Sequence, residues 1–370
     1  MAAPPPHDDA ALSPVFPVAA GLQAGLTASQ LRGPRFDAPH HGLRHTAGGQ
    51  PSLADVVRAL QRTNPGTAAT HATAARLWGM WLPRQWERGP IHLARTRAEG
   101  GAPRRSGVVG HELHPQDPVL VRSGVRITTP AATWAALAQL GLPLDDVVAA
   151  GDSLLQRADG PAGRRRPGEH PRCTVRDLEA EVLRVRGRRG TRTLRAALPL
   201  LRDGADSRAE TLLRLALTDA GVPEPEVNPL LMLSDGSTVR PDLVWREARV
   251  CVQYEGDHHR TDPQQWRRDI ERDRRMQAEG WIVLRVAASV FTRRGLDALL
   301  RDLAAHLRLP LPARARRIGR RARRIGGRGA CVPAEISGSR RPPLASSHTN
   351  APTPVISRPM ISPCTVSVPS

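Results

Sequence analysis

The residues best suited to chemistry lie in the second half of the chain, and most of them are oxygen donors. Asp242 follows Pro241 in the segment RPDLVW, where an aspartate is locally unfavourable among strand-forming apolar residues. Gln253 and Glu255 are two residues apart in VQYEGD, so in a β-strand their side chains share one face. Carboxylate and amide oxygens are hard ligands that suit Mg²⁺ or Mn²⁺. The pattern therefore predicts a divalent-metal site.

The two acids are expected to meet because the strands that contain them should form a hairpin. Cross-strand neighbours lie about 5 Å apart. Asp242 and Glu255 could then bind one divalent cation, with the Gln253 oxygen beside them. Such an ion can activate a water molecule and stabilise charge on a phosphate under attack.

Glu210 is a further oxygen donor, and two interpretations of it stay open. It shares an apolar helix stripe with Leu213 and Leu217 at i, i+3, i+7 spacing, which would direct it toward the sheet. It also ends the sequence Ser207-Arg208-Ala209-Glu210, which is a capping box.

Two adjacent histidines, His258 and His259, come shortly after the candidate metal strand. They are interpreted either as site residues or as part of a polar loop.

These residues must be positioned by a compact unit over residues 205–305. The periodicity and the turn residues predict the order αβββαβ, which is a mixed α/β core. Asp262, Pro263 and Gly280 are the expected N-cap, first residue and terminator of the second helix. The predicted elements are a helix over 207–220, strands at 230–233, 238–245 and 249–255, a helix over 263–279 and a strand over 281–287.

The segments RPDLVW, VQYEGDHHR and RRDIERDRRMQAEGWIVLRV resemble the very-short-patch-repair (Vsr)-like endonucleases of the PD-(D/E)xK nuclease superfamily. The resemblance covers about 100 residues and implies a restriction-endonuclease-like αβββαβ core that cuts DNA with Mg²⁺ or Mn²⁺. It implies that Asp242 binds the metal and that Gln253 and Glu255 occupy the paired acidic positions. The resemblance also implies that Glu210 is the acid of the preceding helix and that His258 or His259 is a proton-transfer or phosphate-contacting group. It implies a structural role for four residues that match the family's helix pattern: Asp269, Arg272, Met276 and Gly280.

The sequence departs from the family pattern at two positions. Gln253 stands where an acid is usual, and Glu255 stands where a lysine is usual; the chain contains no lysine. One ligand charge is therefore lost, and metal binding should be weaker. This leaves a second hypothesis, in which a degenerate nuclease fold binds DNA without cutting it, as a regulator or antitoxin.

Residues 15–157 are predicted to form a mainly helical region that contains a helix-turn-helix. Residues 18–32 suit two short helices around a Gly25 turn, the second capped by Thr27, and 35–47 would be the wing. The segments GLTASQLRGPRF and HATAARLWGMWLP resemble, more loosely, the amino-terminal region of abortive-infection-type antitoxins. A protein partner of this region is not identified, and His71 is expected to be structural.

Other elements follow along the same region and beyond it. Residues 52–82 are expected to be helical, with a second helix over 71–81 that Pro83 stops. The remaining expectations are strands within 90–129, two helices over 130–157, a linker and helix over 158–204, and disorder at 1–14 and 312–370.

The net charge of +19, with a pI near 11.5, favours nucleic acid as a partner. The exclusive use of arginine also fits codon bias in a GC-rich genome. The arginine run at 314–328 is either a solvated tail or a non-specific phosphate contact.

The cysteine pattern and the hydropathy predict a cytoplasmic protein. The four cysteines form no CxxC pair, which argues against a zinc site and against a disulfide framework. No long apolar run or secretory signal is recognised, so neither a transmembrane helix nor a membrane partner is expected.

Overall fold

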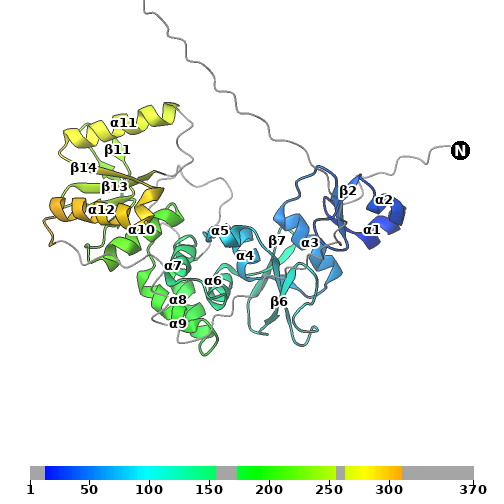
Figure 1. Cartoon of the computed structure of the whole chain (residues 1–370). Helices are drawn as coiled ribbons and strands as arrows, with labels where there is room; N and C mark the ends of the chain where they lie inside the picture. Colours follow the sequence, from blue (N-terminus) through cyan, green and yellow to red (C-terminus); the bar gives the residue numbers. More distant parts are fainter. Residues whose placement is uncertain (1–12, 156–172, 256–262, 311–370) are drawn as a thin grey trace, which may run out of the picture. The chain divides into compact units, whose positions relative to one another are not determined.

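The computed structural model describes residues 13–155, 173–255 and 263–310, with the backbone alone for 263–269. The described chain is mixed α/β, and its strands form sheets of three, five, two and four strands (Figure 1). Three segments considered above lie outside the described residues: the linker over 158–172, the loop with His258 and His259, and the arginine-rich tail.

The first described residues form a pair of short helices and a small sheet. Thr27 begins the second helix with a complete capping box to Gln30, and Gly25 makes the turn at φ 87°. A small apolar cluster that includes Phe16, Leu31 and Phe36 joins the helices to the strands. The elements are β1 (Phe16–Pro17), α1 (Val18–Gln23), α2 (Ala28–Arg32), β2 (Phe36–Asp37) and β3 (Leu43–Thr46), in the sheet order β1-β3-β2.

A five-stranded sheet in the order β6-β5-β4-β8-β7 follows, packed with helices around one large core. Its strands are β4 (Ala68–Ala69), β5 (Ile91–Thr96), β6 (Val108–Leu113), β7 (Val119–Arg122) and β8 (Val125–Thr128). Its helices are α3 (Leu53–Thr63), α4 (His71–Trp78), α5 (Arg84–Glu87), α6 (Pro130–Gln139) and α7 (Leu144–Asp152).

Two local expectations for this region were wrong. The helix that starts at His71 ends at Trp78, not at Trp81, because Gly79 adopts the left-handed conformation that terminates helices. Residues 64–70 are not helical, and Ala68–Ala69 pair with strands on both sides, which requires an extended backbone.

Residues beyond the undescribed linker pack into the same core. α8 (Val175–Arg184) and α9 (Thr191–Ala197), with a 3₁₀ turn at Leu198–Leu200, contribute buried side chains that include Leu178 and Leu194. The helical segment expected between the two regions is thus part of the first core.

The last unit contains a four-stranded sheet in the order β14-β13-β12-β9, in which only the β13–β14 pair is parallel. One face packs on α10 and α12, and the other face packs on Met276 of α11. The elements are α10 (Arg208–Asp219), β9 (Glu226–Val227), β10 (Leu231–Met232), β11 (Thr238–Val239), β12 (Leu243–Trp245), β13 (Val250–Glu255), α11 (Pro263–Ala278), β14 (Ile282–Ala287), a 3₁₀ turn (Ala288–Phe291) and α12 (Arg293–His306).

The strand predicted over 238–245 is instead two strands. β11 pairs with β10 in a separate ribbon, whereas β12 pairs with β13 and β9. Pro241 lies at the break, and proline has no N–H to donate to a ladder. The chain changes partners there, which leaves Asp242 at the very start of β12.

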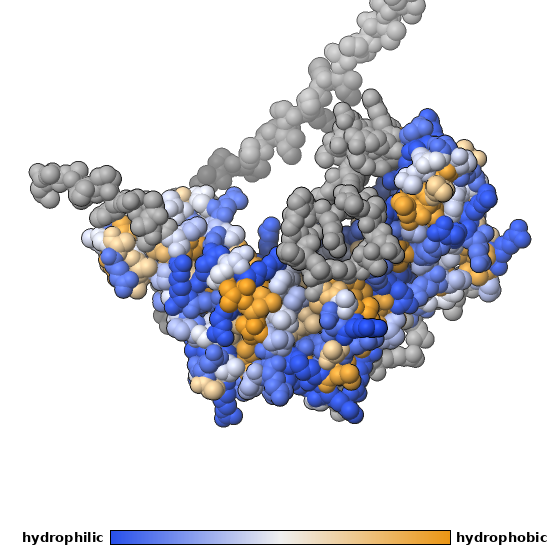
Figure 2. All heavy atoms as spheres, turned by 180° about the vertical axis from the view of Figure 1, so that it is seen from behind, coloured by the Kyte–Doolittle hydropathy of each residue, from blue (hydrophilic) through white to orange (hydrophobic). Residues whose placement is uncertain are grey.

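The face of the molecule in Figure 2 is mostly hydrophilic, with smaller apolar areas between the polar ones. Within the described ranges, every helix is too short or too polar to cross a lipid bilayer.

A buried ion pair connects α10 to α7. The Arg214 guanidinium donates to Asp152 at 3.1 Å, and the two side chains are 1% and 0% exposed. Asp152 also accepts hydrogen bonds from the Thr211 hydroxyl and from the Arg202 N–H. Removal of one partner from such a pair leaves a buried charge without compensation.

We expect Arg214→Met to lower the free energy of unfolding by about 3–5 kcal/mol, because Asp152 would remain buried and unpaired. Arg246→Met is the matched control, since the Arg246–Glu226 pair is exposed, and it should cost less than about 1 kcal/mol. Urea titration at constant pH measures both losses. Equal losses in the two variants would contradict the assignment.

Candidate functional site

Two acidic side chains approach each other at the edge of the four-stranded sheet. Glu210 lies in the first turn of α10 and is only 7% exposed, and Asp242 lies directly before β12. Asn228 bridges them: its N–H donates to the Asp242 carbonyl at 2.7 Å, and its Nδ2 donates to Glu210 Oε2 at 2.5 Å. The Tyr254 N–H donates to Asp242 Oδ2 at 2.6 Å. The Asp242 carboxylate is therefore held from β13 as well.

Glu210 takes part in the hydrogen bonds at the start of α10, where Ser207 is the N-cap, and it also faces Asp242. The Ser207 hydroxyl donates to Glu210 Oε1 at 2.8 Å, and Ser207 Oγ accepts from the Glu210 N–H. The backbone amide that the glutamate binds is that of Asp206, at 2.8 Å. The predicted capping box is therefore incomplete, because the Glu210 carboxylate binds the Asp206 N–H in place of the Ser207 N–H. These contacts leave a site role possible, since two carboxylate oxygens can accept several hydrogen bonds.

Burial, and then the charge of Asp242, raise the pKa of Glu210 to about 7. Hydrogen bonds from Asp206, Ser207 and Asn228 act in the opposite direction. The raised pKa means that the buried Glu210 carboxyl is costly to ionise beside the charged Asp242. A divalent cation would offset this repulsion.

In the antiparallel pair of β12 and β13, Leu243 is opposite Val252. One residue beyond that pair, Asp242 is opposite Gln253. The Gln253 side chain is 7% exposed, and its Oε1 accepts from Arg272 Nη2 at 2.6 Å. Its Nε2 has no hydrogen-bond partner among the described residues. The amide oxygen is therefore engaged by α11.

Glu255 lies two residues further along β13 than Gln253, so it is not the direct cross-strand neighbour of Asp242 that we expected. Its side chain is 49% exposed and forms an ion pair with Arg285. Arg285 also donates to Asp273 at 2.6 Å. The structure thus places Glu210, Asp242 and Gln253 together, with Glu255 at the outer end of β13.

Asn228 was not predicted from the sequence. Its backbone has φ 46°, a conformation that asparagine tolerates better than most residues, and it precedes Pro229. That combination is a signal of an unusual turn, but it does not reveal what the side chain contacts. Arg272, expected to be structural, bonds directly to a candidate site residue.

A second cluster lies in the first core and consists of His71, His92 and His111. One ring nitrogen from each lies within 4.8 Å of the others. Burial lowers the pKa of His92 and of His111 to about 4, and it lowers the pKa of His71 well below its usual value. All three rings are therefore neutral at pH 7.

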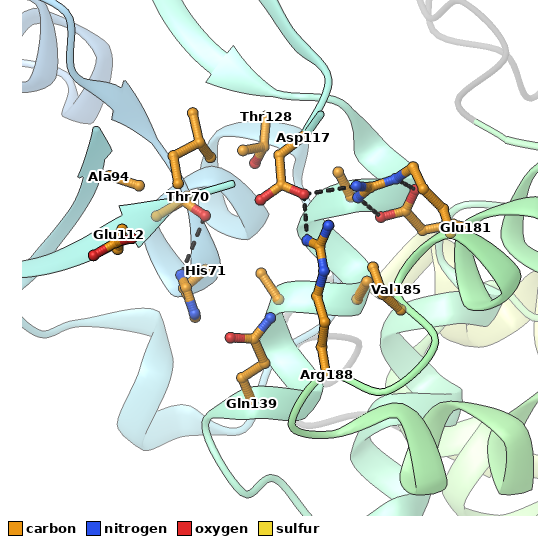
Figure 3. A pocket seen from close by; sticks show the side chains of 15 residues that line it. Thr70, His71, Ala94, Glu112, Asp117, Thr128, Gln139, Glu181, Val185 and Arg188 are labelled. Atoms are coloured by element: carbon orange, nitrogen blue, oxygen red, sulfur yellow. Dashed lines mark hydrogen bonds and ion pairs between the residues drawn. The ribbon is translucent and has the colours of Figure 1, made fainter. Parts of the chain in front are cut away.

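His71 also lines a pocket beside the first core. Figure 3 shows it with Thr70, Glu112 and Gln139, near Asp117 and Arg188, which form an ion pair at 2.5 Å.

Comparison with known proteins gives limited information. The chain is 31% identical over 136 residues to two uncharacterized proteins from two strains of Mycobacterium tuberculosis. The match covers 37% of this chain and 50% of each relative, so the chain spans about half the length of the curated relatives it matches. No family model matches the chain, and no solved structure matches it significantly.

The raised pKa of Glu210 predicts a pH trend in the metal-free protein. The stability that this protonated carboxyl contributes is full below pH 4.5 and is lost as pH rises through about 7. The stability of wild type relative to Glu210→Gln should therefore fall between pH 5 and pH 8. Thermal unfolding with chelator at both pH values measures this difference. Glu226→Gln, at an exposed carboxyl on β9, is the control, and an identical trend in both variants would refute the assignment.

Proposed function

We propose that this protein is a divalent-metal-dependent DNA endonuclease, with its active site in residues 205–305. The observation on which this depends is the pairing of the buried carboxyl of Glu210 with the half-buried carboxyl of Asp242. Within the four-stranded sheet and its helices, the order α10, β9, β12, β13, α11 and β14 supports a restriction-endonuclease-like core of the Vsr type, with the β10–β11 ribbon inserted between β9 and β12.

The donor set fits a hard divalent cation such as Mg²⁺ or Mn²⁺. Glu210 and Asp242 would hold it, because both are acids and the charge of Asp242 opposes ionisation of Glu210. When bound, the ion would activate a water and stabilise charge on the scissile phosphate. Asn228 and the Tyr254 N–H fix the two carboxylates in place before any ion arrives.

The charge of the chain supports DNA as the substrate. A net charge of +19, all of it from arginine, favours contacts with phosphates. We propose that α1, α2 and the β2–β3 hairpin act as a winged helix-turn-helix that positions the nuclease on DNA.

Asp242→Asn should abolish Mg²⁺- or Mn²⁺-dependent nicking of supercoiled plasmid, because it removes one of the two ligand charges. The loss should be at least about 100-fold, which corresponds to about 2.7 kcal/mol. Asp302→Asn, at an exposed position on α12, is the matched control and should nick like wild type. Nicking by Asp242→Asn at the wild-type rate, or nicking that survives chelator, would refute the proposal.

A second candidate function is DNA binding without cleavage, and Gln253 favours it. An amide offers the cation a dipole in place of a charge. Its oxygen is also bonded to Arg272, so it must be released before it can serve as a ligand. A protein with this site could act as a regulator or antitoxin.

Gln253→Glu separates the two functions. If the site is an attenuated nuclease, the added carboxylate should increase Mg²⁺-dependent nicking about tenfold or more, which needs only about 1.4 kcal/mol. The double variant with Asp242→Asn should lose that gain. Absence of nicking by both wild type and Gln253→Glu, in Mg²⁺ and in Mn²⁺, would establish the non-cutting function.

A further inference from the structure

Three histidines from separate elements meet in the first core, about 20 residues apart along the chain. His71 is the first residue of α4, His92 lies in β5, and His111 lies in β6. His92 Nδ1 and His111 Nε2 are 2.9 Å apart, and the rings of His71 and His111 stack with centroids 3.7 Å apart. The side chains of His71 and His92 are buried, at 6% and 2% exposure.

Neighbouring threonines contact the His71 ring and the backbone of His92. The Thr70 hydroxyl is 3.1 Å from His71 Nδ1, and the Thr70 N–H donates to the His92 carbonyl. The His92 N–H donates to the Thr73 hydroxyl at 2.8 Å. Outer contacts of this kind select the ring nitrogen that a metal-binding histidine presents.

Two features of the cluster are costly unless they serve a purpose. His71 has φ 48°, which is uncommon for a residue other than glycine and is found more often at functional sites. His92 Nε2 is buried and has no hydrogen-bond partner among the described residues. Simple packing would be achieved more cheaply by apolar side chains, because a buried polar atom without a partner loses its hydration.

We propose that His71, His92 and His111 bind a divalent transition-metal ion of the Zn²⁺ class. Neutral imidazoles are the nitrogen ligands that Zn²⁺ prefers, and three of them with one open position form a common zinc site. Two nitrogens bound to one tetrahedral zinc lie roughly 3.4 Å apart. Since the nitrogens lie within 4.8 Å of one another, the most distant pair must approach by at most roughly 1.4 Å to bind one ion.

The ion would connect the start of α4 to two strands of the five-stranded sheet. His71 also lines the pocket of Figure 3, so a fourth ligand, water or a small anion, could reach the ion from that side. The sequence pattern favoured a structural His71 and no zinc site, because it offered no cysteine pairs. The structure changes that interpretation, because the fold brings His92 and His111 close to His71. The proposed histidine site is independent of the carboxylate site, whose oxygen ligands suit a harder ion.

The test uses the full chain, stripped with chelator and titrated with Co²⁺ and then with Zn²⁺. We expect one equivalent of Co²⁺ to give the intense visible absorption of a four- or five-coordinate nitrogen site, and Zn²⁺ to remove it. Zn²⁺ should also raise the unfolding temperature. His111→Gln should weaken Co²⁺ binding at least tenfold, because one of three ligands is lost.

Two controls make the result specific. His306→Gln changes a histidine at the end of α12, outside the cluster, and should bind Co²⁺ like wild type. Asp242→Asn should leave this signal unchanged, which separates it from any ion at the carboxylates. His92→Gln supplies a second cluster variant if circular dichroism shows that His111→Gln is unfolded. Absence of the absorption in wild type, or its full retention in a folded cluster variant, would overturn the proposal.

Discussion

The packing of α10 is the constraint on which the candidate nuclease site depends. Arg214 and Thr211 attach this helix to the buried Asp152 of α7, while Leu213 and Leu217 pack on the sheet. Glu210 lies one helical turn before Arg214, so the interactions that hold the guanidinium also set the position of the carboxyl. A fully buried ion pair is rarely the most stable solution, but its geometry is specific. Here that specificity fixes the helix from which the site acid projects.

The two candidate metal sites differ in ligand chemistry as much as in location. Glu210 and Asp242 offer charged oxygens that repel each other, and a small hard cation would relieve the repulsion. The histidine cluster offers neutral nitrogens, which compete better for a softer ion. One chain could therefore hold Mg²⁺ and Zn²⁺ without exchange between the sites. The first ion would serve hydrolysis and the second would hold a helix against a sheet.

Gln253 and Glu255 are both engaged by arginines of neighbouring elements. A carboxylate at position 253 could bind both Arg272 and a metal ion. The amide oxygen of Gln253 is instead already engaged by Arg272. Glu255 is similarly neutralised by Arg285, which it shares with Asp273. The arginines of α11 and β14 thus balance charge around the site. In a chain without lysine, the bidentate guanidinium is available for this purpose at every basic position.

The sequence by itself determined most of the local structure: Thr27 and Ser207 as helix caps, Gly25 as a turn, and the β13 strand. These follow from capping, turn and alternation rules that act over a few residues. Only the tertiary structure decided that the chain changes sheets at Pro241, that Asn228 bridges the two acids, and that three distant histidines meet. The physical reason is that hydrogen bonds and packing between remote segments depend on which elements become neighbours. The periodicity of a short segment does not indicate which remote segment will pack against it.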